Sequence, residues 1–263
     1  ASLSPEDVDI FVHGTTLATN ALIERRGART ALLTTAGMRD SVEIAHENRF
    51  EQYDLAMTRP DPLVPRDLRI GIPERLTSTG FVLRELDENA VLSAITGLKA
   101  LNVESIAVGF LHSYSNPGHE VRVAEILRAA WPEVSVSLSS EVCPEIREYE
   151  RFSTTCANAY IQPLLTRYLT DLEARRQSLG MTCPMLLMQS GGGLGTLEDA
   201  LQFPVRLVES GPAGGALLSA EIARSFGIEK ALSFDMGGTT AKLCIINNGQ
   251  PRTSREFEVG REY

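Results

Sequence analysis

The chain has 263 residues, of which 43% are hydrophobic and 22% charged, and its formal net charge is −9. This composition is typical of a globular protein with one large domain or two. The excess of carboxylates argues against nucleic acid as a partner, because binding to phosphate backbones requires clustered Lys and Arg. No run approaches the roughly 20 apolar residues that span a bilayer, and no signal segment is recognisable. We therefore expect a cytoplasmic protein with no membrane partner.

Short apolar runs alternate with helical patterns in the first part of the chain. They predict a strand at residues 10–12, a helix at 17–26 and a strand at 30–34. Residues 55–73 are rich in proline, which predicts an extended excursion across the surface.

A regular order of helices and strands follows. Asp87 is placed to cap a helix in which Val91, Ile95 and Leu98 recur at helical spacing. After it the patterns predict a strand at 105–110, a helix from 117 and a strand at 134–138. Such alternation predicts a mostly parallel or mixed sheet that is covered by helices.

The second half of the chain begins with a predicted long helix at residues 150–179, in which Pro163 either causes a kink or opens a second segment. Strands are predicted at 185–188 and 205–208, and each is followed by a glycine-rich loop. A helix is predicted to start near Gly214. Two further strands, before Asp235 and at 243–246, form a predicted hairpin.

The turn of this hairpin is the strongest candidate for a ligand site. Gly237 and Gly238 can adopt positive φ and let a phosphate approach the backbone, while Thr239 and Thr240 add hydroxyl donors. Asp235 would repel a polyphosphate unless it held Mg²⁺, directly or through water, or oriented an attacking hydroxyl. The motif thus predicts a nucleotide with Mg²⁺, and an ordinary hairpin without a ligand is the alternative.

The two glycine-rich loops are candidates for the walls of the same cleft, since ligands collect at the carboxyl ends of strands in open α/β sheets. The loop after residue 188 contributes Ser190, Gly191 and Gly192 as candidate substrate residues. The second loop precedes a helix N-terminus, whose amides and dipole favour an anion. Its candidate cofactor-binding residues are Ser210, Gly211 and Gly214. The alternative is that both loops are tight turns only.

A polar segment after the first strand gathers imidazole, hydroxyl and amide groups. We expect a substrate-facing loop there, with the candidates His13, Thr15, Thr16 and Asn20. In the competing interpretation one threonine caps the helix and His13 is a core residue.

The remaining polar residues carry weaker signals. His46, His112 and His119 lack partners at metal-site spacing and are interpreted as structural or surface residues. The charged segment 147–151 is interpreted as a solvated or salt-bridged helix face. The 4 cysteines form no metal-binding pattern and are expected to be reduced packing residues.

Five motifs in this order closely resemble the hydantoinase A/5-oxoprolinase family, which includes N-methylhydantoinase A subunits and acetone carboxylase beta-subunit-like proteins. The motifs are His13-Gly14-Thr15-Thr16 with Ala18-Thr19-Asn20, Arg147-Glu148-Tyr149-Glu150-Arg151, Gln189-Ser190-Gly191-Gly192-Gly193, Ser210-Gly211-Pro212-Ala213-Gly214-Gly215 and Phe234-Asp235-Met236-Gly237-Gly238-Thr239-Thr240.

The resemblance implies an α/β protein with the actin/sugar-kinase/Hsp70-like (ribonuclease H-like) ATPase fold, with mixed sheets and flanking helices. It implies ATP-dependent opening of a cyclic amide such as hydantoin, N-methylhydantoin or 5-oxoproline, in which phosphate activates a carbonyl. A hydantoinase B-like subunit or domain would be the partner, and homo-oligomerisation stays open.

Two features of the family are absent from the sequence: the first Asp-x-Gly-Gly-Thr phosphate loop and the adenosine-binding glycine region. In addition, Gly192 stands where the family often has a polar residue. We therefore expect an internal fragment, incomplete at both ends, that is inactive alone. By resemblance, residues 1–150 form an N-terminal α/β domain, 151–180 a connecting helix and 181–263 the start of the main ATPase domain.

Three alternatives to the cyclic amide hydrolase stay open at this point. They are an acetone carboxylase-type subunit, a small-molecule kinase on the same fold and a non-catalytic module in which nucleotide gates assembly. The fold alone does not separate them.

Overall fold

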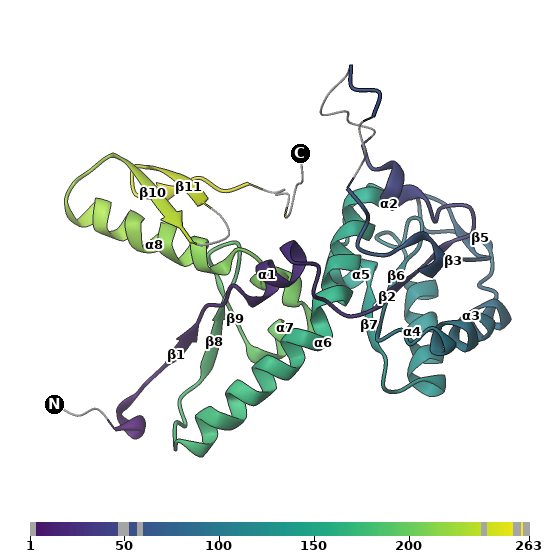
Figure 1. Cartoon of the computed structure of the whole chain (residues 1–263), viewed down its shortest axis with the longest axis horizontal. Coiled ribbons are helices and arrows are strands. Elements are labelled where there is room, and N and C mark those ends of the chain that lie inside the picture. The colour runs from purple at the N-terminus through teal and green to yellow at the C-terminus, as the bar shows by residue number, and fades with distance from the viewer. Residues whose placement is uncertain (1–3, 47–52, 57–59, 238–240, 255–258, 260–263) are drawn as a thin grey trace. The chain divides into compact units, whose positions relative to one another are not determined.

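The computed structural model describes residues 4–46, 53–56, 60–237, 241–254 and 259 (Figure 1). The chain divides into two compact units. Unit 1 combines Ala1–Glu24 with Leu165–Gly260, and unit 2 contains Arg25–Leu164. The chain passes between the units at Glu24–Arg25 and Leu164–Leu165, and the domain boundaries at residues 150 and 180 stay a prediction. The N-terminal segment belongs to unit 1 because its strand pairs with a strand of the second half.

Unit 2 is an α/β unit around a four-stranded sheet. Its elements are β2 (Thr30–Thr35), α2 (Ser41–Ile44), η2 (Arg66–Leu68), β3 (Arg69–Ile72), β4 (Arg75–Leu76), β5 (Val82–Arg84), α3 (Glu88–Ala100), β6 (Ser105–Gly109), α4 (Gly118–Ala130), β7 (Ser135–Leu138), α5 (Ser139–Val142) and the first part of α6 (Glu148–Ser178). The strand order is β3-β2-β6-β7 and every pairing is parallel, as the alternating pattern predicted.

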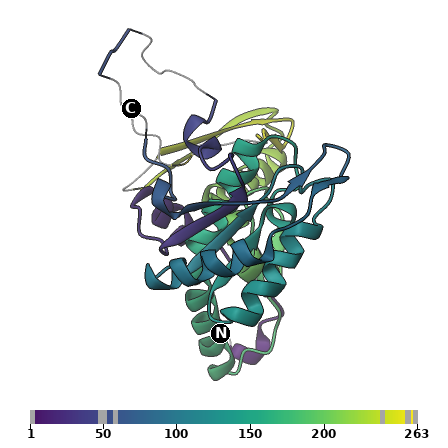
Figure 2. The same ribbon diagram turned by 90° about the vertical axis from the view of Figure 1, so that its right-hand side faces the viewer.

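Helices cover both faces of this sheet. α3 and α4 lie side by side (Figure 2), and their apolar residues join those of β2 and β6 in one core. α6 packs on the face that carries Gly109 and Ser137, since Phe152 approaches Gly109 and Asn158 donates a hydrogen bond to Ser137 Oγ. With both faces buried, β2 and β6 need continuous apolar runs rather than alternation.

The helix α3 confirms the cap and the periodicity that the sequence predicted. Asp87 Oδ1 accepts a hydrogen bond from the Ala90 amide at 3.0 Å, and Val91, Ile95 and Leu98 are buried. Burial of each such side chain contributes about 1.5–3 kcal/mol, so the packed face holds this helix more firmly than its cap does.

The predicted surface excursion at residues 55–73 is wrong at its C-terminal end. The 3-10 helix η2 begins after Pro65, and β3 pairs with β2, with Leu68 and Ile72 buried. The prolines flank this strand instead of interrupting it. The hydrogen bonds between the edge strand β3 and β2 therefore require no proline amide.

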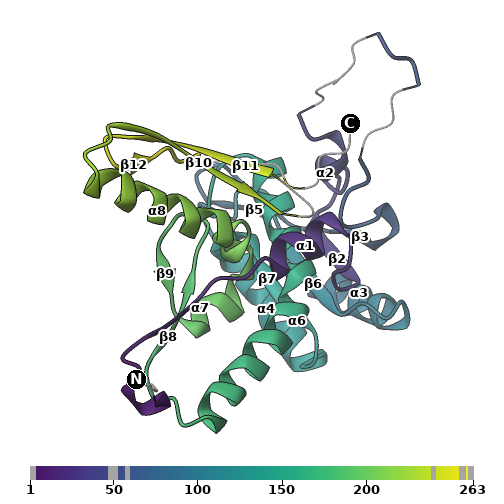
Figure 3. The ribbon, with the colours of Figure 1, turned by 60° about the vertical axis from the view of Figure 1, so that its left-hand side comes forward.

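Unit 1 contains two small sheets. Its elements are η1 (Pro5–Asp7), β1 (Phe11–His13), α1 (Leu17–Ile23), the later part of α6, β8 (Met185–Met188), β9 (Leu194–Gly195), α7 (Leu197–Gln202), η3 (Pro204–Leu207), α8 (Ser210–Ser225), β10 (Lys230–Met236), β11 (Ala241–Asn247) and β12 (Gln250–Pro251). β1 and β8 are parallel, and β9 pairs antiparallel with β8. β10 and β11 form the predicted hairpin, with α8 lying along it (Figure 3).

Two predictions about unit 1 need correction. Residues 205–208 are not a strand, because Pro204 opens the 3-10 helix η3 and Leu207 supplies its buried contact. α8 begins at Ser210 rather than near Gly214, so Gly214 lies in the second turn.

α6 runs as one helix through Pro163. Within the described part of the chain, no helix is both long and apolar enough to cross a membrane.

Candidate functional site

The polar segment after β1 forms the start of α1. The Thr15 hydroxyl accepts the Leu17 amide at 3.1 Å, and Asn20 Nδ2 donates to Thr16 Oγ1 at 3.4 Å. Thr15 therefore satisfies one of the first-turn amides that have no intrahelical acceptor. The N-cap residue itself, Thr16, makes no side-chain cap hydrogen bond, and the substrate role of both threonines stays a prediction.

His13 ends β1 and contacts the later part of α6. Its Nε2 lies 2.9 Å from Tyr168 Oη, and the ring centroids are 5.8 Å apart. Partial burial lowers the pKa of the imidazole below its ordinary value, because burial disfavours the charged form. A neutral His13 is the form that this environment favours near pH 7.

The start of α8 is held against α1 and its preceding loop. Ser210 Oγ donates to the Thr15 carbonyl oxygen at 3.0 Å, and Thr19 Oγ1 accepts the Glu209 amide at 2.9 Å. A Cβ on Gly211 would lie 3.6 Å from Thr16 Cγ2. The structure thus brings together candidates from two predicted groups, and it engages the Ser210 hydroxyl in an internal bond.

The loop after β8 reaches the same helix. The Ser190 amide donates to the Arg206 carbonyl at 2.8 Å. Gly192 has φ +81, and a Cβ there would meet Leu217 Cδ1 of α8 at 3.3 Å. Gly214 faces Met188, whose Cε would lie 3.7 Å from a Cβ at that position. Gly191 is open, since a Cβ there would meet nothing within 4 Å.

The end of the β10–β11 hairpin carries the candidate metal residue. Asp235 is exposed and pairs in register with Lys242, which places both side chains on one face. Lys242 Nζ lies 2.7 Å from Glu209 Oε2, so this face of the hairpin is joined to the residue that precedes α8. Gly237 is also exposed. The predicted phosphate-binding residues Gly238, Thr239 and Thr240 lie outside the described residues.

The carboxylate of Asp235 is compatible with a Mg²⁺ ion that also binds a phosphate. No group of three or more His, Cys, Asp or Glu residues able to hold a metal occurs among the residues described here. Mg²⁺ commonly binds through one or two carboxylates plus substrate phosphates and waters. The exposed carboxylate of Asp235, two residues before Gly237, fits that requirement.

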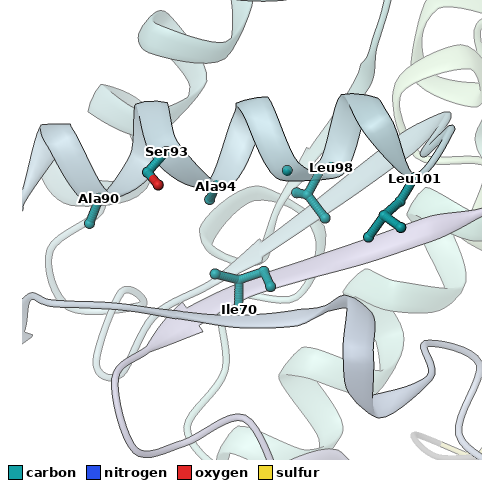
Figure 4. A pocket seen from close by; sticks show the side chains of 7 residues that line it. Ile70, Ala90, Ser93, Ala94, Leu98 and Leu101 are labelled. Carbon is teal, nitrogen blue, oxygen red and sulfur yellow. The ribbon is translucent and has the colours of Figure 1, made fainter.

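Unit 2 contains an apolar groove that does not include these candidates. It has a volume of about 330 Å³ and lies against α3 and β3 (Figure 4). It is lined by Ile70, Ala90, Ser93, Ala94, Gly97, Leu98 and Leu101. No charged side chain lines the groove, and Ser93 supplies the one polar side chain of the lining.

Three residues of the site were missed in the sequence. Thr19 was named only as part of a motif, and neither Glu209 nor Lys242 was singled out. The pairing of Lys242 with Asp235 could have been predicted from the sequence, because the length of a hairpin turn fixes the register of its strands. The ion pair between Lys242 and Glu209 could not have been predicted, since it depends on where α8 begins.

The described units are α/β, with one parallel, one mixed and two antiparallel sheets. Residues 1–131 match the hydantoinase/oxoprolinase N-terminal region, and residues 151–263 match the hydantoinase/oxoprolinase model. The chain belongs to the hydantoinase/oxoprolinase family.

Several relatives support this assignment. The chain is 38% identical to caprolactamase subunit alpha of Pseudomonas jessenii over 257 residues, which is 97% of this chain and 37% of that protein. It is 34% identical to 5-oxoprolinase of Saccharomyces cerevisiae over 278 residues, covering 94% of this chain and 21% of that protein. The chain therefore spans well under half the length of these relatives.

Two solved structures are similar to this fold. The crystal structure of the ATP-dependent caprolactamase from Pseudomonas jessenii matches 92% of this chain and 35% of its own, with a TM-score of 0.83 and 38% identity. The nucleotide-free structure of acetone carboxylase matches 91% of this chain and 35% of its own, with a TM-score of 0.81 and 27% identity.

Proposed function

We propose that this chain is the nucleotide-using part of an ATP-dependent hydrolase that opens a cyclic amide. The proposal rests on the ion pair between the β10–β11 hairpin and the residue before α8. In it, Lys242 Nζ lies 2.7 Å from Glu209 Oε2. It sets the exposed carboxylate of Asp235 and the first turn of α8 in one unit of the fold. The names of the relatives, caprolactamase and 5-oxoprolinase, supply the class of substrate.

The charges around this region fit a polyphosphate with Mg²⁺. A phosphate chain beside Asp235 requires a cation, because the two negative charges otherwise repel. The first-turn amides of Ser210 and Gly211 add donors and the favourable end of the helix dipole. We assign phosphate binding to Gly237, Gly238, Thr239 and Thr240 as well, and Mg²⁺ to Asp235.

ATP, when bound, supplies a phosphoryl group that makes an amide carbonyl carbon more electrophilic. The protein's own part is to position that group and the ring. We assign the ring to the segment around His13, Thr15, Thr16 and Asn20 and to the loop of Ser190, Gly191 and Gly192. A neutral His13 can accept or donate one hydrogen bond at the substrate without adding charge. Ser210 and Gly214 support this wall of the site through their contacts with Thr15 and Met188.

The proposal extends to architecture and partners. We assign the two units to an actin-like ATPase fold and expect a hydantoinase B-like partner that completes the reaction, since one relative is named as a subunit. Hydantoin, N-methylhydantoin, 5-oxoproline and caprolactam are the candidate rings. The four free cysteines favour a reducing compartment such as the cytoplasm.

A second function is favoured by one specific observation. The nucleotide-free acetone carboxylase structure superposes almost as well as the caprolactamase, with TM-scores of 0.81 and 0.83. A carboxylase-type subunit, in which the carbonyl belongs to a ketone, is therefore the second candidate.

The test is ADP release by the complete native polypeptide with its co-encoded partner, using each candidate ring and acetone with bicarbonate. Stimulation by a ring supports the hydrolase, and stimulation by acetone selects the carboxylase. Asp235→Ala should lower the stimulated rate about 100-fold or more, as loss of a key charge-stabilising group does. The matched control is Asp171→Ala, which removes an exposed carboxylate on the part of α6 within unit 1. Wild-type rates in Asp235→Ala would exclude Asp235 as the metal residue.

A further inference from the structure

Glu209 has an unusual backbone and an unusual side-chain environment. Its φ is 65, in the left-handed region that non-glycine residues seldom adopt. One carboxylate oxygen, Oε2, binds Lys242, whereas Oε1 is buried without a hydrogen-bond partner in the part of the chain that the structure describes. Strained backbone and an unsatisfied buried group are both concentrated at functional sites.

The surrounding contacts hold Glu209 in this conformation. Its amide donates to Thr19 Oγ1, and the next residue, Ser210, donates its hydroxyl to the Thr15 carbonyl. These bonds fix the turn between η3 and α8 from two sides. The carboxylate is thereby directed to one place on the hairpin, the ammonium group of Lys242.

Lys242 lies on the same face of the hairpin as the candidate metal residue, Asp235. It is directly opposite Asp235 in the hairpin register, and its side chain is 33% exposed while that of Glu209 is 17% exposed. An ammonium group has three donors, of which Glu209 Oε2 engages one. Glu209 is the one partner of this ammonium group among the residues that the structure describes.

We propose that Lys242 binds one of the outer phosphates of the nucleotide and that Glu209 is the residue that positions it. This inference rests on the proposed function, and it adds a cation to a site where Asp235 and Glu209 both oppose an anionic ligand. The ammonium bridges Glu209 Oε2 and a phosphate oxygen.

The inference predicts that affinity depends on the phosphate chain. Binding of ATP, ADP and AMP with Mg²⁺ would be measured by calorimetry on the complete native polypeptide with its partner. Lys242→Met should weaken ATP binding by about tenfold or more, the usual effect of losing a hydrogen bond to a charged group. AMP binding should change by less than about twofold if the lysine contacts the outer phosphates.

The matched control is Lys230→Met, which removes the same charge from the other end of the hairpin. Lys230 is exposed and pairs in register with Asn247. The control should leave the ATP affinity nearly unchanged. Thermal melting of each variant distinguishes a loss of binding from a loss of folding.

A double-variant cycle tests the positioning role of Glu209. Glu209→Gln keeps the shape of the side chain and should weaken ATP binding less than Lys242→Met does. If Glu209 acts only through the lysine, the same substitution in the Lys242→Met background should have no further effect on affinity. An equal additional loss in that background would overturn the positioning role.

The outcomes distinguish a failure of this inference from a failure of the proposed function on which it rests. If the wild-type protein binds ATP and Lys242→Met binds it equally well, the inference is wrong and the proposed function stands. Equal losses of ATP and AMP binding in Lys242→Met would likewise overturn the phosphate contact. If the wild-type protein binds no ATP, the proposed function fails and this inference fails with it.

Discussion

The two compact units bury their strands to very different extents. In unit 2 every residue of β2 and β6 is buried, and helices cover both faces of the sheet. In unit 1 one face of the β10–β11 hairpin is apolar and exposed: Leu232, Phe234, Met236, Leu243 and Ile245. The other face of the hairpin carries Asp235 and Lys242. The comparison shows that Asp235 and Lys242 lie on an incompletely covered hairpin, whereas the strands β2 and β6 lie in a closed core.

Truncation of one leucine in each unit should show this difference most clearly. Leu33 of β2 is 0% exposed and Leu243 of β11 is 67% exposed. Leu33→Ala should lower the free energy of unfolding by about 2–5 kcal/mol, and Leu243→Ala by less than about 0.5 kcal/mol. Denaturant unfolding followed by hydrogen exchange assigns each loss to its unit. A loss at Leu243 as large as that at Leu33 would mean that the exposed face is covered in the native protein, and the contrast would be broken.

A small addition to the core of unit 2 should also destabilise it. A Cβ on Gly109 would lie 2.5 Å from Phe152 Cδ1, and Phe152 is fully buried. Gly109→Ala should therefore lower the free energy of unfolding by about 1–3 kcal/mol. The control is Gly97→Ala in α3, where a Cβ meets nothing within 4 Å. That change should raise stability by about 0.5–1 kcal/mol, because alanine favours the helix. If both variants melted alike, the core would be looser than the structure indicates.

The closed core of unit 2 also contains a buried carboxylate, Glu120. It accepts hydrogen bonds from the Phe110 amide, the Ser139 hydroxyl and the Ser140 amide. Burial raises the pKa of this carboxyl, although the three donors oppose the shift. The folded state then holds a proton to a higher pH than the unfolded state. Its contribution to stability is lost as the pH rises from about 4.5 through the folded pKa.

Glu120→Gln should remove this pH dependence and lower stability by about 1–2 kcal/mol, because the amide donor must face one of three existing donors. Unfolding free energies between pH 4.5 and 7.5 test it. Glu125→Gln on the exposed face of α4 is the control and should have little effect, since it disrupts only a surface ion pair with Arg122. An unchanged pH profile in Glu120→Gln would assign the titration to another group.

The sequence predicted what depends on local pattern. The cap at Asp87, the buried face of α3 and the parallel order of unit 2 follow from residue spacing within one or two elements. The hairpin around Asp235 is confirmed for the same reason. Such features need no knowledge of distant residues.

Features that depend on distant contacts were not predictable in this way. β1 pairs with β8 across most of the chain, which decides the two units. The short apolar run at 205–208 fits a strand and a buried 3-10 turn equally well, and Pro204 selects the turn. The interpretation of His119 as structural missed its buried partner, Glu74, at 2.8 Å. The charged segment 147–151 likewise hides a fully buried Arg151, which donates to the Phe110 carbonyl.

The smallest expected effect concerns His13 of unit 1, whose burial is only partial. Because burial lowers its pKa, the unfolded state binds the proton more readily, and stability is lost as the pH falls through about 6.5. Solvent screening at this partly exposed site limits the loss to about 1 kcal/mol or less. His13→Gln should flatten the profile between pH 7.5 and 5.5 in hydrogen exchange of β1 and β8. Tyr168→Phe removes the 2.9 Å bond to Nε2 but keeps the neighbouring ring, so the pH dependence should persist. Its disappearance in Tyr168→Phe would show that the hydroxyl, rather than burial, sets the protonation of His13.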